Sequence, residues 1–464
     1  MSMISPKFQS ALYLYILLFT GLALVIPIEY VLEIILFILF VLVFSGVFFY
    51  SSLLIATLKE YPFSITDVPR GFFEPAVYVL IPAHNEESVI GKTASCILNQ
   101  DYTNLKLFLI NDNSTDGTLE IMKSIKSRNP EKVEVVNVPP DRGKSKPRAL
   151  NYALDLILKE YSHPDYIFIL DADYLLSPRA IRTLVGILEN APKYVIGVQG
   201  NVRPRNWNRN FVTRFITLER LVGFNVTIEG DFKLNENGKY GGTVALLRFP
   251  YIIKLGKFTP NAVTEDTDLW ARALIEGYRF WYYHGVIGWE ECVETMRDYI
   301  KQRSRWAQGH LQVMVNYYWS VLKNCSTIEE AFIEHFYMMS YLVPVFWFLS
   351  VVLNGYRIIS HITPVYRNSW FYLLVSLMAF LVFWISIAYA NWIEKRRHGF
   401  GVQWWFVALY PLYFLIFVMA GVIYTLRGLL RLLVGGFTGR RREGLPEGIN
   451  HAEPVHFTLK YFIV

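Results

Sequence analysis

Long apolar segments occupy the N-terminal end of the chain. They run from Ala11 to Ile28 and from Val31 to Leu58, and Glu33 is the only charged residue within them. A helix needs roughly 20 apolar residues to cross a bilayer, so both segments are long enough. A signal peptide is the alternative for the first, but no small-residue cleavage site precedes the second. The pattern predicts two transmembrane helices within residues 1–58.

Three further apolar segments lie in the C-terminal third, at Phe336–Tyr356, Trp370–Trp392 and Trp404–Leu426. They predict transmembrane helices within residues 336–434. An arginine cluster at Gly439–Glu443 follows them, and basic loops favour the cytosolic side. If the middle of the chain is cytosolic, three complete spans would leave this cluster outside. A broken or re-entrant pair around Pro411 would resolve the conflict.

Between the two ends, short apolar runs alternate with segments of helical character. The runs are Ala76–Pro82, Leu105–Asp112, Val133–Val138 and Asp165–Leu170. Short buried strands that alternate with helices form parallel sheets with right-handed crossovers. We therefore expect an α/β domain over residues 59–290 and interfacial helices over residues 291–335.

Polar side chains follow these strands where each one ends. Asn85 and Glu86 follow the first run, Asp112 ends the second, and Asp171 and Asp173 follow the fourth. Ligands of parallel sheets bind at the carboxyl ends of the strands. The pattern therefore places a ligand site at this edge of the sheet.

The composition agrees with a membrane protein. Of 464 residues, 53% are hydrophobic and only 18% are charged, whereas soluble domains carry about 25% charged residues. Basic loops beside apolar spans explain the net charge of +6 better than nucleic-acid binding does. The three cysteines lack metal-binding spacing and cannot all pair, which indicates reduced cytosolic thiols.

Two groups of carboxylates are candidates for chemistry. Asp171 and Asp173, one residue apart after a strand, could hold Mg²⁺ together with substrate phosphates, although a solvated turn is the plainer alternative. Glu265, Asp266 and Asp268 lie at a predicted helix start. Thr264 can cap this helix and acids favour its first turn, yet one carboxylate could also act as a general base.

Three other clusters have both a structural and a functional interpretation. The basic loop near residue 146 is either surface or diphosphate contact, and the glycines before Thr243 form either a turn or a close approach to substrate. Gln302, Arg305 and Trp306 share one helix face, as an interfacial helix or as a site for diphosphate and sugar. His310 lacks metal-binding spacing and is interpreted as an ordinary helix residue.

The motifs IPAHNE, NDNSTDGT, KPRALN, DAD, TED and QRSRW occur in this order between the apolar ends. In this respect the chain resembles membrane-integrated processive glycosyltransferases of family 2, the group of cellulose, hyaluronan, chitin and poly-N-acetylglucosamine synthases. The resemblance covers nearly the whole chain. It implies a cytosolic, Rossmann-like GT-A domain inserted between N-terminal and C-terminal transmembrane helices.

The resemblance assigns the nucleotide pocket. It implies that Ala83, Glu86 and Asp112 line the nucleoside pocket and that Lys146 lies near the nucleotide. Asn111 departs from the family, in which many members have an aspartate at this position.

The resemblance also assigns the acids. Asp171 and Asp173 would bind the diphosphate, with both as candidate ligands of Mg²⁺ or Mn²⁺ and Asp173 as the main one. Asp266 would be the catalytic base, and Glu265 beside it would contact substrate.

For the acceptor side, the resemblance implies that Gln302 and Arg305 contact the diphosphate and Trp306 the acceptor sugar. Gly242 and Thr243 would lie near the acceptor terminus.

The C-terminal segment 435–464 resembles a gating loop, in which Thr458 and Lys460 close over bound nucleotide. This segment would then have to be cytosolic.

These residues together imply an inverting, metal-dependent transfer of a sugar from a nucleotide-sugar, most commonly a UDP-sugar in the family. The acceptor would be a growing β-linked polysaccharide, with polymerisation coupled to translocation across the cell membrane. One alternative is the transfer of a single sugar to a lipid-linked acceptor. Another is a catalytically silent membrane transport or scaffold protein, which intact acids at Asp173 and Asp266 disfavour.

Overall fold

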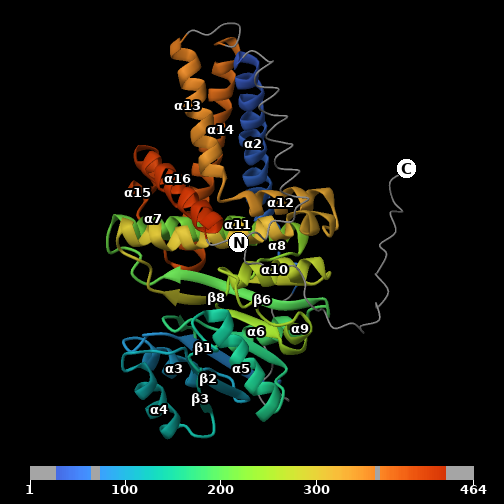
Figure 1. The fold of residues 1–464 in the computed structure, drawn as a ribbon, viewed down its shortest axis with the longest axis vertical. Helices are drawn as coiled ribbons and strands as arrows, with labels where there is room; N and C mark the ends of the chain where they lie inside the picture. The colour runs from blue at the N-terminus through green and yellow to red at the C-terminus, as the bar shows by residue number, and fades with distance from the viewer. Residues whose placement is uncertain (1–27, 64–73, 361–365, 435–464) are drawn as a thin grey trace, which may run out of the picture.

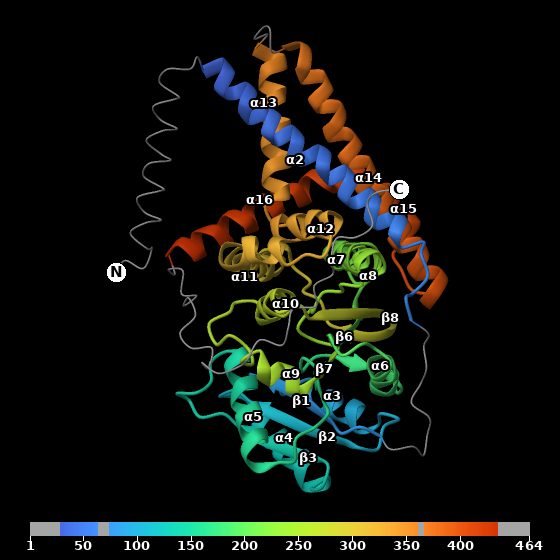
Figure 2. The same ribbon diagram turned by 90° about the vertical axis from the view of Figure 1, so that its right-hand side faces the viewer.

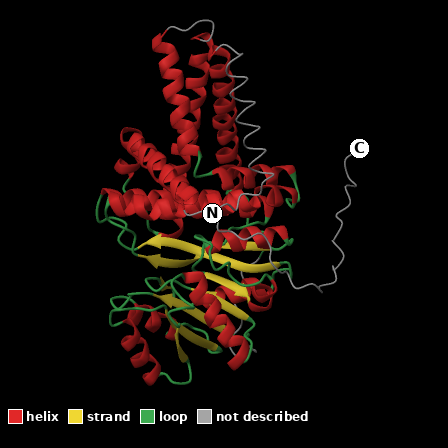
Figure 3. Cartoon of the chain, in the orientation of Figure 1, coloured by secondary structure: helices red, strands yellow, loops and turns green. Residues whose placement is uncertain are grey.

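The computed structural model describes residues 28–63, 74–360 and 366–434. An α/β domain lies at one end and long helices lie at the other, with a layer of helices between them (Figures 1 and 3). Most of the predicted span Ala11–Ile28 lies outside the described residues, and so do Thr458 and Lys460.

Within the described residues, eight strands form one sheet in the order β3-β2-β1-β4-β7-β6-β8-β5. Strands β1 to β4 pair in parallel, whereas β7 is antiparallel to β4 and to β6. β8 is parallel to β6 and antiparallel to β5. The bounds are β1 (Val77–Ala83), β2 (Leu105–Asn111), β3 (Val133–Asn137), β4 (Tyr166–Ile169), β5 (Leu175–Leu176), β6 (Val195–Pro204), β7 (Ala245–Arg248) and β8 (Arg279–Glu290).

The four parallel strands coincide with the four apolar runs of the sequence, and the predicted α/β class is confirmed. The other half of the sheet departs from the all-parallel expectation. The connection from β6 to β7 is helical and returns to the sheet at Gly238, which forms an antiparallel bridge with Phe280 near the start of β8. β7 then pairs antiparallel with residues Gly197–Gln199 of β6.

Helices cover both faces of the sheet. One apolar core packs side chains of α3, α4 and α6 against the sheet, and a second packs those of α5, α9 and α10 against the opposite face. The bounds are α3 (Ile90–Leu98), α4 (Thr118–Arg128), α5 (Lys146–Glu160), α6 (Ala180–Glu189), α9 (Phe249–Lys254) and α10 (Glu265–Ile275). These layers bury the parallel strands on both sides, which explains their continuous apolar runs.

A layer of helices separates the sheet from the long helices (Figure 2). A π-helical turn interrupts one of them, and such turns are rare and occur frequently at functional sites. Threonine side chains cap α11 and α12, because Thr295 accepts from the Asp298 N–H and Thr327 from the Glu330 N–H. The layer consists of α7 (Phe211–Val222), η1 (Gly223–Ile228), α8 (Glu229–Asn235), α11 (Met296–Lys323) and α12 (Ile328–Met339).

Three described helical segments are long and apolar enough to cross a membrane: Ile34–Ala56, Leu373–His398 and Tyr410–Val434. A bent pair, α12 with α13, makes a fourth if the pair is one broken span. The long helices are α2 (Ile28–Ala56), α13 (Val343–Ser360), α14 (Tyr366–His398), the short α15 (Trp404–Ala408) and α16 (Tyr410–Val434).

Two expected spans are not single straight helices. The segment Phe336–Tyr356 bends by 80° between α12 and α13, where Pro344 lies in the first turn of α13 and lacks the N–H that would extend the helix before it. The segment Trp404–Leu426 is divided at Leu409 into α15 and α16. In both views α16 lies obliquely across the base of the bundle, near α11 (Figures 1 and 2).

Buried ion pairs attach the end of α14 to the α/β domain. Arg203 on β6 pairs with Glu394 at 2.5 Å, and both side chains are fully buried. Asn225 of the π-helical turn donates to Glu394 at 2.8 Å, and Arg397 pairs with Glu229 at 2.7 Å. These contacts fix the end of α14 relative to the sheet.

Candidate active site

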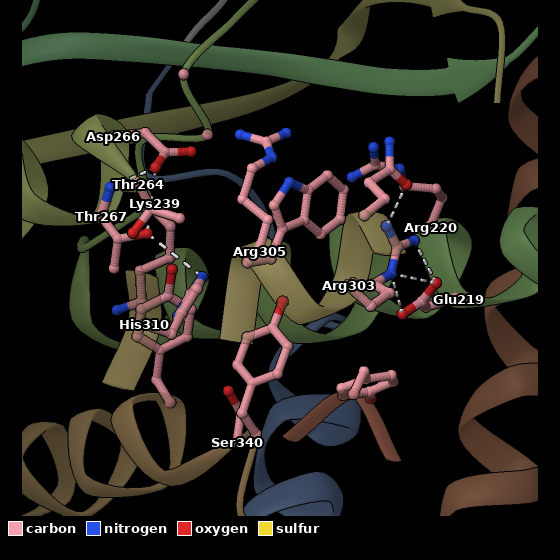
Figure 4. Close-up of a pocket in the computed structure, with 18 of the residues that line it drawn as sticks. Glu219, Arg220, Lys239, Thr264, Asp266, Thr267, Arg303, Arg305, His310 and Ser340 are labelled. Atoms are coloured by element: carbon pink, nitrogen blue, oxygen red, sulfur yellow. Dashed lines mark hydrogen bonds and ion pairs between the residues drawn. The ribbon is translucent and has the colours of Figure 1, made fainter. Parts of the chain in front are cut away.

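A cavity of about 1560 Å³ opens at the carboxyl ends of β1 and β4 and continues through the middle layer into the helix bundle. Figure 4 shows its central part, where side chains from α10 and α11 point into a common space. The α/β end of the wall is rich in charged groups, whereas the bundle end is apolar and aromatic. Of the site residues predicted from the sequence, the following line this cavity: Glu86, Lys146, Asp171, Asp173, Gly242, Thr243, Glu265, Asp266, Gln302, Arg305 and Trp306.

Lys146 joins three segments of this wall. Its Nζ lies 2.6 Å from Asp171 Oδ1 and 3.1 Å from Glu265 Oε1, and it donates to the Gly242 carbonyl at 2.8 Å. Burial alone would lower the pKa of Lys146, but the two carboxylates outweigh it and raise that pKa well above its usual value. The ammonium therefore stays charged at this point of the cavity wall.

Carboxylates crowd together just past β4. Burial, with the charges of Asp171 and Glu290, raises the pKa of Asp173 to about 7. Lys146 neutralises Asp171, whereas Asp173 has no cationic partner among the ion pairs of the described residues. A divalent cation would relieve this repulsion.

The donor set is compatible with such a cation. Among the described residues, no group of three or more His, Cys, Asp or Glu side chains forms a metal site by itself. Mg²⁺ usually takes one or two carboxylates and completes its shell with phosphate oxygens and water. Asp173, with Asp171 beside it, meets this requirement once a diphosphate is present.

Asp266 lies at the first turn of α10. Its Oδ1 accepts from the Thr267 N–H at 2.7 Å and from the Thr267 hydroxyl at 3.3 Å. Its Oδ2 faces Gly242, where an added Cβ would lie 3.0 Å away. Burial raises the pKa of Asp266, partly offset by Thr267 and Lys146, which favours a carboxylate that can accept a proton.

Thr264 and Asp268, at the same helix start, make contacts within the protein. Thr264 occupies the N-cap position as expected, but its side chain makes no capping bond. Its hydroxyl is buried without a hydrogen-bond partner, and the side chain packs against Gly309 of α11, where an added Cβ would lie only 2.4 Å from it. Asp268 pairs with Arg272 at 2.8 Å and is absent from the cavity wall.

Gln199, which the sequence did not single out, holds the loop of Gly242 and Thr243 by hydrogen bonds to its backbone. Gln199 Nε2 donates to the Thr243 carbonyl at 2.8 Å, and its Oε1 accepts from the Gly241 N–H at 2.8 Å. Thr243 Oγ1 in turn accepts from the Asp171 N–H at 3.0 Å. Gly242 has φ +77°, a conformation that favours glycine.

The helix α11 places Gln302, Arg305 and Trp306 in the cavity wall, on the shared face that their spacing predicted. Arg305 points into the same space as Asp266 (Figure 4). Within the described residues Arg305 forms no ion pair, so its charge is available to a ligand.

Two arginines that the sequence did not single out, Arg303 and Arg220, pack against the ring of Trp306. The guanidinium of Arg303 lies 4.0 Å from the centre of the Trp306 ring and pairs with Glu219 at 2.5 Å. Arg220 lies 5.0 Å from the same ring and pairs with Glu290 at 2.8 Å. No spacing signal identifies these residues, because their partners lie 70 or more positions away.

The three residues that the resemblance assigned to a nucleoside pocket divide into two groups. Glu86 lines the cavity, whereas Ala83 and Asp112 lie behind its wall, joined by the Asp112 N–H donating to the Ala83 carbonyl at 2.9 Å. Asp112 Oδ1 accepts from the Lys144 N–H at 2.8 Å. Asn111, the departure from the family pattern, donates to Asn137 on β3 at 2.7 Å.

Replacing Gly143 with alanine is expected to weaken donor binding. An added Cβ would lie 2.0 Å from Asp112 Oδ1, so the carboxylate would have to leave the Lys144 N–H. Losing one such hydrogen bond corresponds to about a tenfold rise in donor KM, with kcat little changed. Initial rates against donor concentration would test this. Gly91→Ala is the matched control, because its Cβ meets only Ile121 at 3.8 Å. An unchanged donor KM for Gly143→Ala would contradict a role of Asp112 in donor binding.

Comparison with known proteins adds to this geometry. Residues 75–309 match the protein family described as "Glycosyltransferase like family 2". The chain is 30% identical to the Bacillus subtilis protein named "Probable glycosyltransferase YdaM", over 70% of this chain and 76% of that one. It is 25% identical to the poly-beta-1,6-N-acetyl-D-glucosamine synthase of Staphylococcus aureus, over 68% of this chain and 74% of that one.

A solved structure is similar in fold. The mannosyltransferase PcManGT from Pyrobaculum calidifontis, in complex with GDP-Man and Mn²⁺, superimposes with a TM-score of 0.53 at 21% sequence identity. The match covers 78% of this chain and 99% of that one.

Proposed function

Since this chain belongs to glycosyltransferase family 2 and uses a nucleotide-sugar donor, we propose that it transfers the sugar with inversion and with the help of a divalent cation. This proposal rests on one observation: the side chains of Lys146, Asp173, Asp266 and Arg305 line the same cavity. The acids and cations there suit the two halves of the reaction, activation of an acceptor and departure of a diphosphate.

The chemistry is a single displacement. Asp266 accepts the proton of an acceptor hydroxyl, whose oxygen forms a bond to the anomeric carbon. The bond from that carbon to the phosphate oxygen breaks at the same time, and the electron pair leaves with the nucleoside diphosphate. Because attack is from the opposite face, an α-linked donor yields a β-linkage.

Stabilisation of the leaving group falls to the cationic side chains. Lys146 and Arg305 line the same cavity as Asp173 and Asp266, and fixed charges of this kind act where negative charge develops. A divalent cation held by Asp173, with Asp171 nearby, supplies Lewis-acid stabilisation of the diphosphate when bound. The Mn²⁺ in the complex of the similar mannosyltransferase supports this.

For the acceptor we propose a growing polysaccharide. Support comes from the similarity to the poly-beta-1,6-N-acetyl-D-glucosamine synthase and from the continuity of the cavity. Beyond Trp306 the cavity continues between α2, α13, α14 and α16, so a product could extend from the site into the bundle without leaving the protein. This arrangement supports the proposal that addition is processive and coupled to translocation.

A second candidate is a lipid-linked acceptor, and the composition of the cavity wall favours it. The part of the wall formed by α2, α13, α14 and α16 contains no charged side chain among the described residues. Its lining includes Phe49, Phe346, Trp347, Phe380 and Phe414. A hydrocarbon chain would fit such a surface, because apolar area is buried there without leaving polar groups unpaired.

We also propose a multi-pass location in the cell membrane with the α/β domain in the cytosol. The last turn of α14, next to that domain, contains Lys395, Arg396 and Arg397, and basic residues favour the cytosolic face. α16 runs obliquely across the base of the bundle and not along it (Figure 2), which agrees with a broken or re-entrant last span.

The test is nucleotide release by the full chain in nanodiscs, with a panel of UDP- and GDP-sugars in the presence of Mg²⁺, Mn²⁺ or EDTA. We expect release from one donor and its loss in EDTA. A ladder of β-linked oligosaccharides would support the polysaccharide acceptor, and a single sugar in the organic-solvent extract would support the lipid acceptor. Retention of configuration, or full activity in EDTA, would contradict the mechanism.

A further inference from the structure

His310 lies beside the proposed base, although its sequence context indicates only a helix residue. It lines the cavity from α11, and its Nε2 lies 3.3 Å from Thr267 Oγ1 (Figure 4). Its ring packs against Tyr341 with the centroids 4.8 Å apart and against Tyr337 with the centroids 5.8 Å apart. The imidazole is therefore held in place by aromatic rings, with one nitrogen directed at Thr267.

Thr267 connects this histidine to Asp266. The Thr267 hydroxyl has one proton, and it lies within 3.3 Å of both His310 Nε2 and Asp266 Oδ1. If Nε2 accepts, the hydroxyl proton points away from Asp266. If Nε2 carries the proton and donates, the hydroxyl is free to donate to Asp266 Oδ1. Burial lowers the pKa of His310 to about 4, so the ring is neutral near pH 7 and carries its single proton on one nitrogen.

We propose that His310 is a positioning residue for the base: it donates from Nε2 to Thr267 Oγ1 and thereby commits the Thr267 hydroxyl to Asp266 Oδ1. This inference rests on the proposed role of Asp266 as the base. The two Thr267 donors hold Oδ1, which leaves Oδ2 facing Gly242, where the acceptor hydroxyl would be. His310 touches no substrate in this arrangement and acts through Thr267.

The arrangement has a consequence for the pH dependence of kcat. A hydrogen bond to a carboxylate stabilises its charged form and lowers its pKa. Without a donor at position 310, the Thr267 hydroxyl can instead donate to a backbone carbonyl of the preceding helical turn, so the pKa of Asp266 rises and the acidic limb of kcat moves to higher pH. The titratable and charged groups that face or adjoin Asp266 are Lys146, Tyr240, Glu265, Arg305, Tyr337 and Tyr341. These groups are unchanged in the variants below.

The test compares His310→Phe with His310→Gln in the full-length protein. Phenylalanine keeps a ring but cannot donate, whereas the glutamine amide can donate to Thr267. We expect His310→Phe to lower kcat about tenfold, to leave donor KM within about twofold, and to shift the acidic limb upward by about half a pH unit. In His310→Gln, kcat and the position of the acidic limb should both lie close to their wild-type values.

Thr267 supplies an independent arm if His310→Phe does not fold. Thr267→Val removes the hydroxyl with little change in shape, and Thr267→Ser keeps it. We expect the valine variant to reproduce the loss in kcat and the shifted limb, and the serine variant to resemble the wild type. In the double variant, His310→Phe should add no further loss to Thr267→Val, because both act on one hydrogen bond.

His284→Gln is the matched control. His284 also has its pKa lowered to about 4 by burial, but it bonds to Tyr61 at 2.9 Å and lies outside the cavity wall. Additive losses in the double variant, or an acidic limb unchanged in Thr267→Val, would overturn the proposal for His310. If Asp266→Asn retained wild-type turnover, the proposed base itself would be wrong, which is a separate outcome.

Discussion

Replacing Asp266 with asparagine is expected to lower kcat by about a thousandfold while leaving donor affinity nearly unchanged. Positioned proton transfer contributes about a hundredfold to ten-thousandfold in enzymes, and asparagine keeps the shape of the side chain without its basicity. The Thr267 N–H that bonds Oδ1 at 2.7 Å can still bond the amide oxygen, so α10 should keep its first turn. The loss is therefore one of chemistry and not of folding.

Two measurements separate these effects. Single-turnover rates report the chemical step, and equilibrium titration of the nucleotide-sugar reports binding. Asp268→Asn is the control on the same helix, because Asp268 pairs with Arg272 at 2.8 Å and is absent from the cavity wall. Asp268→Asn should lower the melting temperature and leave kcat nearly unchanged. Wild-type turnover in Asp266→Asn would exclude Asp266 as the base.

Replacing Asp173 with asparagine is expected to lower kcat by about a hundredfold or more and to raise the metal concentration needed for half-maximal activity. Without metal, the same change should stabilise the protein. The pKa of Asp173 is raised to about 7 in the folded chain, above the usual value of about 3.9. In the metal-free protein its contribution to stability is therefore present at low pH and is lost as the pH rises through 7.

Asparagine removes this penalty because it carries no charge. In EDTA at pH 8, Asp173→Asn should melt at a higher temperature than the wild type, by an amount equivalent to on the order of a few kcal/mol. Asp171→Asn offers the contrast, since Asp171 neutralises Lys146 at 2.6 Å and its loss should not stabilise. Equal melting temperatures for Asp173→Asn and wild type, together with full activity, would contradict the metal role.

Much of the α/β domain follows from local patterns. Strands β1 to β4 appear within one or two residues of the apolar runs, because a strand buried on both faces needs an uninterrupted apolar segment. The apolar segments at the ends of the chain were equally clear. The 80° bend between α12 and α13 was not predicted, because Pro344 ends the helical hydrogen bonding there but does not set the angle between the two helices.

The motif residues were identifiable by type, but their partners were not. Gln302, Arg305 and Trp306 share a helix face, and their spacing predicts this. The same spacing left out Arg303, whose charge is balanced by Glu219 from α7, 84 positions earlier. Such a contact requires two helices brought together by the fold.

The sequence by itself determined the α/β class, the parallel strands, the apolar ends and the chemical types at the site, because periodicity and strand-end polarity are local properties of the chain. Only the tertiary structure decided that Lys146 lies between Asp171 and Glu265, and that His310 reaches Thr267 beside Asp266. These contacts join residues 25 to 119 positions apart, and their distances depend on the packing of the sheet against α10 and α11. Hydrogen bonds and charges act over a few ångströms, so the order of residues along the chain does not specify them.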